Sequence, residues 1–234
     1  MNKISILAVI PARGGSKGVL RKNIRELAGK PLIEYTIEVS LKSEYVSRTI
    51  VTTDNEEIAS VSEEAGAEVP FIRPAELAED DTPTLPVLQH ALDYYNEKKS
   101  YEPQVVILLQ PTSPLRRAEH IDEAFELYMN SENKSLISVC EVEHSPYWMK
   151  ELDDENQIQP FLDSDKKYTR RQDLPPIYRP NGAIYISTPE IILNEDRIYE
   201  KNAKAYIMEK ENSIDIDTKI DFELAETLIE RGEG

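Results

Sequence analysis

The sequence predicts an α/β fold: three layers, with helices on both faces of a mainly parallel central sheet. The chain opens with a continuous apolar run, residues 4–11, as expected for a strand that is buried on both faces. Segments with strand and helix patterns then alternate along the chain, which is typical of βαβ units. Its 234 residues suit one large domain of this class.

The remaining elements follow from local patterns. We expect strands at residues 48–54, 68–72, 104–110, 136–142, 182–186 and 203–208, and helices at 31–41, 55–65, 85–99, 118–130 and 222–230. Pro31 suits a first helical turn, Asp54 or Asn55 can cap the second helix, and Gly66 can end it. Residues 104–110 are the most apolar strand, so we place them centrally.

This order of elements predicts where a ligand binds. Right-handed crossovers bring the loops that follow parallel strands to one edge of the sheet. Ligands of open α/β sheets bind at that carboxyl edge. We therefore expect the basic loop after the first strand to face the site together with Asp54, Arg73 and Gln110.

Residues 144–178 interrupt the strand and helix rhythm with prolines and a polar stretch. The segment still contains Trp148, Phe161, Tyr168 and Tyr178, so it is more than a linker. We expect a single domain over residues 1–234 from which this segment projects as an inserted arm.

Composition excludes some classes of function. The net charge of −17 argues against broad binding to nucleic acid or to an anionic membrane. No apolar run reaches the ~18 residues that a membrane span needs. The single cysteine, Cys140, lies in an apolar strand and favours a buried thiol in a reducing compartment, the cytoplasm. His90, His120 and His144 lack metal-ligand spacing, and we expect His90 and His120 on helix surfaces.

The loop after the first strand has the character of an anion site. Residues 11–30 contain six basic residues and one acidic residue, a local charge of +5 within an acidic chain. In Arg13-Gly-Gly-Ser-Lys17-Gly the glycines let backbone N–H groups converge on a phosphate. Lys22 adds further charge. The spacing is neither a Walker A loop nor Gly-x-Gly-x-x-Gly, which disfavours a P-loop kinase; a solvated charge run is the alternative.

Two aspartates near the C-terminus form a candidate metal site. In an extended segment Asp215 and Asp217 lie on one face, roughly 7 Å apart. Such a pair can hold one Mg²⁺, or two neighbouring ions, together with phosphate oxygens. The alternative is that Asp217 or Thr218 only caps the following helix.

Two further segments are candidates for polar ligand contacts. Arg179-Pro-Asn181-Gly182 precedes a strand, and Gln110 emerges at the end of the central one. An Asn-Gly turn and a Pro-rich turn are the alternatives that the residues leave open.

Taken together, the motifs resemble the acylneuraminate cytidylyltransferases, the CMP-sialic acid synthetases. Five segments occur in that family's order: Ile10-Pro-Ala-Arg-Gly-Gly-Ser-Lys-Gly, Arg73-Pro-Ala-Glu-Leu-Ala, Leu109-Gln-Pro-Thr-Ser-Pro-Leu-Arg, Arg179-Pro-Asn-Gly-Ala-Ile-Tyr and Ser213-Ile-Asp-Ile-Asp-Thr. The resemblance implies a Rossmann-like nucleotidyltransferase fold and transfer of CMP from CTP to a nonulosonic sugar acid, with Mg²⁺ and release of pyrophosphate. It also implies a homodimer formed through the arm.

The resemblance assigns roles to individual residues. The nucleotide would contact Ala12, Arg13, Gly14, Gly15, Ser16, Lys17, Lys22, Asn23, Arg73, Thr82 and Thr84. The sugar acid would contact Gln110, Arg171, Arg179 and Asn181, and Mg²⁺ would bind Asp215 and Asp217. Arg13, Lys17, Lys22 and Asp217 would act in catalysis. Leu20 departs from the proline that is common there, and the register of residues 80–84 leaves the base contact open.

Two other functions compete with this one. A sugar-1-phosphate nucleotidyltransferase of the same fold would bind a second phosphate in place of a carboxylate. A catalytically silent nucleotide or sugar sensor would not need the aspartate pair. The sequence does not identify the acceptor among sialic, legionaminic and pseudaminic acids.

Overall fold

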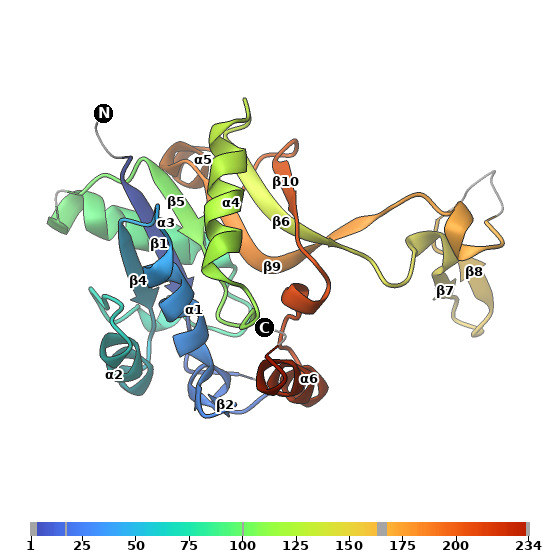
Figure 1. Ribbon diagram of the computed structural model, residues 1–234, viewed down its shortest axis with the longest axis horizontal. Coiled ribbons are helices and arrows are strands. Elements are labelled where there is room, and N and C mark those ends of the chain that lie inside the picture. Colours follow the sequence, from blue (N-terminus) through green and yellow to red (C-terminus); the bar gives the residue numbers. More distant parts are fainter. Residues whose placement is uncertain (1–3, 17, 100, 163–167, 233–234) are drawn as a thin grey trace.

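The computed structural model describes residues 4–16, 18–99, 101–162 and 168–232. Within them, a six-stranded sheet in the order β10-β6-β9-β5-β1-β4 forms the centre of the molecule (Figure 1). Its strands are β1 Ile6–Pro11, β4 Arg48–Thr52, β5 Val105–Leu108, β6 Ser135–Glu141, β9 Tyr178–Ser187 and β10 Lys204–Ile207. β9 runs antiparallel to both neighbours, whereas the other pairs are parallel. The predicted α/β fold with a mainly parallel sheet is confirmed.

Side chains of β1 alternate between two hydrophobic cores, one on each face of the sheet. Ile6, Ala8 and Ile10 belong to one core, and Leu7 and Val9 to the other, which explains the continuous apolar run. The first core is covered by α1 Leu32–Lys42, α2 Glu56–Glu64 and α4 Ala118–Met129, and the second by α3 Thr84–Tyr94 and α5 Pro189–Asn194. The sheet is therefore the middle of three layers.

The C-terminal helix α6, Lys219–Glu230, packs against the N-terminal loop region. A third hydrophobic cluster joins Val19 and Leu27 to Ile216 and Phe222. In the same region the two-residue strands β2 Glu26–Leu27 and β3 Lys30–Pro31 pair. Short 3-10 turns occur in the chain at η1 Lys22–Ile24, η2 Ala75–Leu77 and η6 Glu211–Ser213. This cluster brings the two ends of the sequence to one edge of the sheet.

Several local expectations need correction. Residues 68–72 form only two isolated bridges, one to Ile50 of β4 and one to Thr53 just after it, because Pro70 has no N–H to donate. The third helix ends at Tyr94 and continues as a π-helical turn, η3 Tyr95–Lys99. His120 is buried and accepts a hydrogen bond from the Arg117 backbone, and the half-buried His90 packs edge-on against Phe71. Neither histidine is a surface residue.

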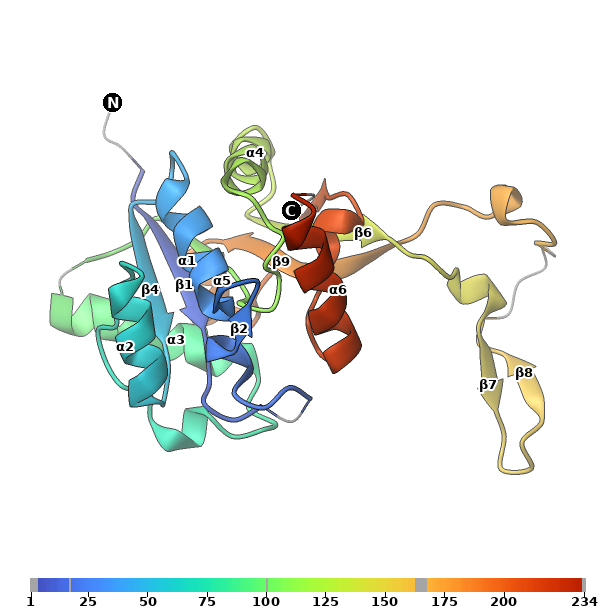
Figure 2. The same ribbon diagram turned by 60° about the horizontal axis from the view of Figure 1, so that its bottom comes forward.

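The segment at 144–178 projects from the sheet. β6 and β9 continue outward as a pair, in which Glu141 lies opposite Tyr178, and they lead to a hairpin of β7 Lys150–Leu152 and β8 Ile158–Pro160. Figures 1 and 2 both show this hairpin extended away from the other layers. The turns η4 Pro146–Trp148 and η5 Arg171–Asp173 lie at its base.

None of the helices in the described part of the chain is both long enough and apolar enough to span a lipid bilayer.

Candidate active site

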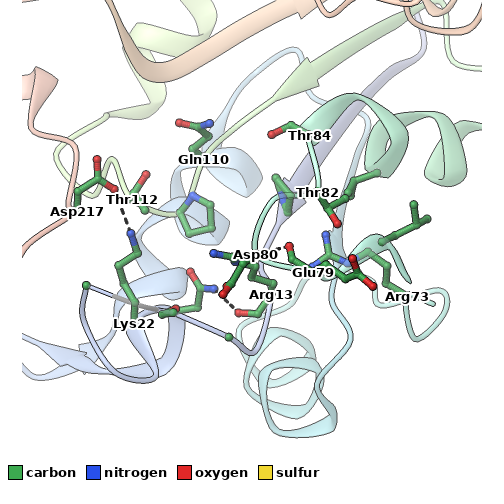
Figure 3. A pocket seen from close by; sticks show the side chains of 18 of the residues that line it. Arg13, Lys22, Arg73, Glu79, Asp80, Thr82, Thr84, Gln110, Thr112 and Asp217 are labelled. Carbon is green, nitrogen blue, oxygen red and sulfur yellow. Dashed lines mark hydrogen bonds and ion pairs between the residues drawn. The ribbon is translucent and has the colours of Figure 1, made fainter. Parts of the chain in front are cut away.

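A cavity of about 460 Å³ opens at the carboxyl edge of β1, β4 and β5. Many of the predicted site residues line it, namely Arg13, Gly15, Ser16, Lys22, Asn23, Arg73, Thr82, Thr84, Gln110, Asp215 and Asp217. Figure 3 shows Lys22 and Asp217 at one end and Arg73 at the other. The fold thus brings the basic loop and the aspartate pair together from opposite ends of the sequence.

The path of the basic loop is set by backbone and side-chain hydrogen bonds. The Ala12 N–H donates to the Thr52 carbonyl at 3.0 Å, and the Gly14 N–H donates to Asp54 Oδ1 at 2.9 Å. Asn23 Nδ2 donates to the Arg13 carbonyl at 2.9 Å. The N–H groups of Ala12 and Gly14 are both bonded within the protein, so in this structure neither residue offers the nucleotide a free N–H.

The cations of the basic loop do not converge on the cavity as the charge count suggested. Of the described ones, Arg13 and Lys22 line it. The others bind elsewhere: Arg21 pairs with Glu57, Arg25 lies over the Phe222 ring, and Lys30 pairs with Glu38. Lys17 lies outside the described residues. The local charge of +5 therefore overstates the charge that a ligand would meet.

Lys22 connects the basic loop to the aspartate pair. Its Nζ donates to the Ile216 carbonyl at 2.6 Å and lies 3.5 Å from Asp217 Oδ1. The same two segments touch at Gly18, where a Cβ atom would lie 2.0 Å from the Asp217 carbonyl oxygen. Only glycine allows this approach, so the loop sequence is fitted to the C-terminal segment.

Asp215 and Asp217 differ in their surroundings. Asp217 is exposed, whereas Asp215 is half-buried and bonded by the Thr112 side chain. Burial raises the pKa of Asp215 against the lowering effect of the Thr112 hydrogen bond, and the negative charge of Asp217 adds to the rise. A divalent cation would relieve that repulsion, and two carboxylates beside a phosphate site are donors that suit Mg²⁺. No larger cluster of His, Cys, Asp or Glu suited to a metal occurs in the described residues.

Arg73 forms the other end of the cavity and is only 4% exposed. Burial lowers the pKa of Arg73, and its Nη2 lies 3.6 Å from Asp54 Oδ1, beyond hydrogen-bond distance. Within the described residues, its Nε and Nη2 have no hydrogen-bond partner. A buried guanidinium without its full set of partners is costly, which is a common mark of a ligand-binding position.

Gln110 and Gly182 meet beside Asp215 in the cavity. Gly182 has φ +77°, and a Cβ there would lie 2.5 Å from Gln110 Oε1 and 3.2 Å from Asp215 Oδ2. The Gln110 side chain thus rests against the backbone of β9, beside Asp215. Glycine is needed at 182 both for its φ and for this contact.

The other predicted sugar-binding residues do not line the cavity. Asn181 is fully buried, where its Oδ1 accepts from Ser138 at 2.6 Å and its Nδ2 donates to Ser213 at 2.9 Å. Arg179 is exposed near Asp215, and Arg171 lies in the turn η5, out on the arm (Figure 1). Direct contact of these residues with a sugar stays a prediction.

Asp80 and Thr112 are among the cavity-lining residues that the sequence-based set lacked. Arg13 Nη1 donates to the Glu79 carbonyl at 2.8 Å and pairs with Asp80 Oδ1 at 3.0 Å. Thr112 lines the cavity and its carbonyl accepts from the Ile216 N–H at 2.9 Å. The motif that begins at Leu109 contains Thr112 but gives no sign of its contact with the distant aspartates.

A family model and several known proteins that match this chain all indicate the same family. A family model described as cytidylyltransferase matches residues 7–233. N-acylneuraminate cytidylyltransferase of Escherichia coli is 41% identical over 228 residues, which cover 97% of this chain and 52% of that protein. CMP-N,N'-diacetyllegionaminic acid synthase of Legionella pneumophila is 39% identical over 96% of both chains. Pseudaminic acid cytidylyltransferase of Campylobacter jejuni is 34% identical over 95% of both. The chain thus spans about half the length of the E. coli relative and nearly all of the other two.

Solved structures share the fold at low sequence identity. CMP:2-keto-3-deoxy-manno-octonic acid synthetase in complex with CTP superposes with a TM-score of 0.72 at 16% identity, over 97% of this chain and 99% of that one. A 4-diphosphocytidyl-2C-methyl-D-erythritol synthase gives 0.71 at 13% identity, over 98% and 100%. The nucleotidyltransferase fold that the resemblance implied is confirmed, and by the family match and these relatives the chain belongs to the cytidylyltransferase family.

Proposed function

We propose that the protein transfers CMP from CTP to a nonulosonic, sialic-type sugar acid and releases pyrophosphate. The observation that supports this proposal is the contact of Lys22 with Ile216 and Asp217, since it brings a lysine ammonium group beside a carboxylate pair in one cavity. Relatives that match over nearly their whole length are named for legionaminic and pseudaminic acids, which supports this class of acceptor.

In the proposed reaction a sugar hydroxyl attacks the α-phosphorus of CTP, and the bond to the pyrophosphate oxygen breaks. Catalysis then rests on alignment and on neutralising the charge that develops on the phosphates. Lys22 is suited to this task because the Ile216 carbonyl fixes its ammonium group at one place. Arg13 lies nearer the middle of the cavity, beside Asp80 (Figure 3).

We propose that Asp215 and Asp217 would hold Mg²⁺. The bound ion would supply positive charge to the phosphates and acidify the acceptor hydroxyl. The chain's own part is to hold Asp215 in place through Thr112 and to leave Asp217 exposed to the cavity. Among the described residues that line the cavity there is no histidine, so we propose that water ordered by Asp217 accepts the hydroxyl proton.

Pyrophosphate release tests the proposed function. Purified protein is incubated with CTP and Mg²⁺, and with sialic, legionaminic or pseudaminic acid, a sugar 1-phosphate, or no acceptor. We expect release only with a sugar acid, and loss of release after chelation of the metal. Asp217→Asn, which keeps the side-chain shape, should abolish it. Release only with the sugar 1-phosphate would support the rival enzyme, and CTP binding without release would support a sensor.

We also propose that the protein is a homodimer formed through the arm. Two-stranded hairpins are marginally stable alone, and this one exposes large apolar side chains. They are Trp148, Met149, Leu152, Ile158, Phe161 and Leu162. A second copy that covers them would bring Arg171 of each arm toward the cavity of its partner. A cytoplasmic location fits the use of CTP and the free, buried thiol of Cys140.

Mixing two inactive variants tests this arrangement. If Arg171 acts in the partner's site, Lys22→Ala and Arg171→Ala chains combine to give one intact site in each mixed dimer. Activity should then recover to about a quarter of wild type after exchange of subunits. A monomer by light scattering, or no recovery in verified mixed dimers, contradicts the proposed dimer or the role of Arg171.

A further inference from the structure

Arg116 is the largest fully buried side chain in the described part of the protein. It is 1% exposed and does not line the cavity. Burial lowers the pKa of Arg116 to about 9. No acidic side chain among the described residues forms an ion pair with it, so its charge is met by neutral acceptors alone. Burying a charged arginine without an anionic partner costs free energy of folding, so we expect Arg116 to have a specific role.

The guanidinium of Arg116 joins two strands and a helix. Its Nη1 donates to the Ala183 carbonyl at 2.7 Å and to the Gln110 carbonyl at 3.3 Å, and its Nη2 donates to Thr36 Oγ1 at 2.6 Å. Thr36 Oγ1 in turn donates to the Gln110 carbonyl at 3.4 Å. The backbone just after β5 is therefore held to β9 and α1 by a single buried group.

This arrangement determines where the Gln110 side chain lies. Ala183 follows Gly182, and a Cβ at Gly182 would lie only 2.5 Å from Gln110 Oε1. The Gln110 amide thus rests directly on the piece of β9 that Arg116 ties to the Gln110 carbonyl. A change in the separation of these two backbones would move the amide relative to the cavity.

The loop from Gln110 to Arg116 also supports the aspartate pair. The Thr112 carbonyl accepts from the Ile216 N–H at 2.9 Å, and the Leu115 carbonyl accepts from Asn212 Nδ2 at 3.1 Å. By contrast, Arg73 at the other end of the cavity lies near Asp54 and has no contact with this loop among its described ion pairs. The direct hydrogen bonds of Arg116 thus reach Gln110, Ala183 and Thr36 and do not reach the Arg73 end of the cavity.

We infer that Arg116 is a positioning residue for the acceptor: without touching the substrate, it fixes the backbones of Gln110 and Ala183 so that the Gln110 amide faces the sugar acid. The inference rests on the proposed function, because Gln110 is assigned there to the acceptor. It predicts a selective effect. We call the hydrogen bonds of Arg116 to Gln110, Ala183 and Thr36 the clamp. Loss of the clamp should weaken binding of the sugar acid and leave binding of CTP unchanged.

The test measures KM for the sugar acid and for CTP separately in matched variants. Thr36→Val removes one hydroxyl of the clamp and keeps the side-chain shape, so it should fold. We expect it to raise the sugar-acid KM about tenfold and to change the CTP KM by less than about twofold. Thr36→Ser, which keeps the hydroxyl, should restore the wild-type value. Arg116→Lys keeps charge without the planar fork and should act like Thr36→Val. Arg117→Met alters the exposed neighbouring arginine and should change neither constant.

Two outcomes overturn the inference while the wild-type enzyme remains active. One is an equal rise in both KM values for Thr36→Val, which indicates general loosening of the fold. The other is unchanged sugar-acid KM in both Thr36→Val and Arg116→Lys. If the wild type releases no pyrophosphate with any sugar acid, the proposed function itself fails, and the inference fails with it.

Discussion

The two ends of the cavity are built in different ways. The nucleotide end, as we call the part of the cavity that the proposed function assigns to CTP, contains Arg13 and Arg73. Both residues follow β1 or the bridges beside β4, and groups from the same edge of the sheet hold them. At the acceptor end, which the proposed function assigns to the sugar acid, Gln110 depends on Gly182, which is far away in sequence, while Arg171 lies out on the arm (Figure 1). The first end is laid out by the strand order, whereas the second depends on packing between distant segments.

This difference has a consequence for evolution of specificity. A nucleotide end that is fixed by the strands can stay constant while the acceptor end changes through a few packing contacts. The curated relatives, named for three different sugar acids at 34–41% identity, are consistent with such a division. Variants that separate the two ends therefore test the division directly.

The largest effect is expected at Lys22. Lys22→Ala removes a fixed charge from the proposed phosphate site and should lower turnover at saturating substrates by about 100-fold or more. Lys30→Ala is the matched control, because Lys30 belongs to the same loop but pairs with Glu38 and lies over the Tyr35 ring. Its turnover should stay near wild type. Similar losses in both variants would mean that the loop acts only through its overall charge.

A second large effect is expected at Arg73, at the nucleotide end. Arg73→Met should raise the CTP KM about tenfold to 100-fold and leave the sugar-acid KM unchanged. Its free energy of unfolding should not fall, because the change removes buried Nε and Nη2 groups that lack hydrogen-bond partners and loses only the 3.6 Å ion pair with Asp54. Chemical denaturation measures this alongside the kinetics, with the exposed Arg197→Met as control. A large loss of stability would show that Arg73 is structural.

The sequence predicted the nucleotide end better than the acceptor end. The apolar run of β1, the N-cap at Asn55 and the turn at Gly66 are local signals, and the structure has all three. Strand order then brings the loops together without further information. The loop charge was misjudged because the acidic and aromatic partners of Arg21, Arg25 and Lys30 come from other elements.

At the acceptor end, the missing information was three-dimensional. β9 pairs with β6 through a register shift between Ile137 and Val139, and the Asn181 side chain turns into the protein interior beside Ser138. The local sequence Arg179-Pro-Asn-Gly contains no signal that predicts this register shift. The antiparallel direction of β9 follows from the path of the arm, which returns the chain from the far end of β6.

At Gly182 we expect an effect of intermediate size, mainly at the acceptor end. Gly182→Ala should raise the sugar-acid KM about tenfold, because the new methyl group would displace the Gln110 amide. Gly29→Ala separates this from backbone strain. Gly29 has φ +90°, yet a Cβ there would meet no atom within 4 Å. Both variants should lose stability, about 1–3 kcal/mol, but only Gly182→Ala should change KM. Equal kinetics in the two would exclude the contact with Gln110.

The smallest effect on KM is expected at Asp80, whose acidic side chain lies inside the nucleotide end. The Asp80 carboxylate pairs with Arg13 at 3.0 Å, a position where a phosphate oxygen would compete with it. Both side chains are partly exposed, so the pair contributes at most about 1 kcal/mol.

Asp80→Asn should therefore lower the CTP KM by about twofold to fivefold, since the triphosphate no longer displaces a carboxylate from Arg13. The difference from wild type should shrink at about 0.5 M salt, where exposed charges are screened. Glu57→Gln, which neutralises the partner of Arg21 outside the cavity, is the control and should leave the KM unchanged. A higher CTP KM in Asp80→Asn would instead make Asp80 part of the nucleotide contact, and the nucleotide end would then depend on the 79–84 loop as well as on the strands.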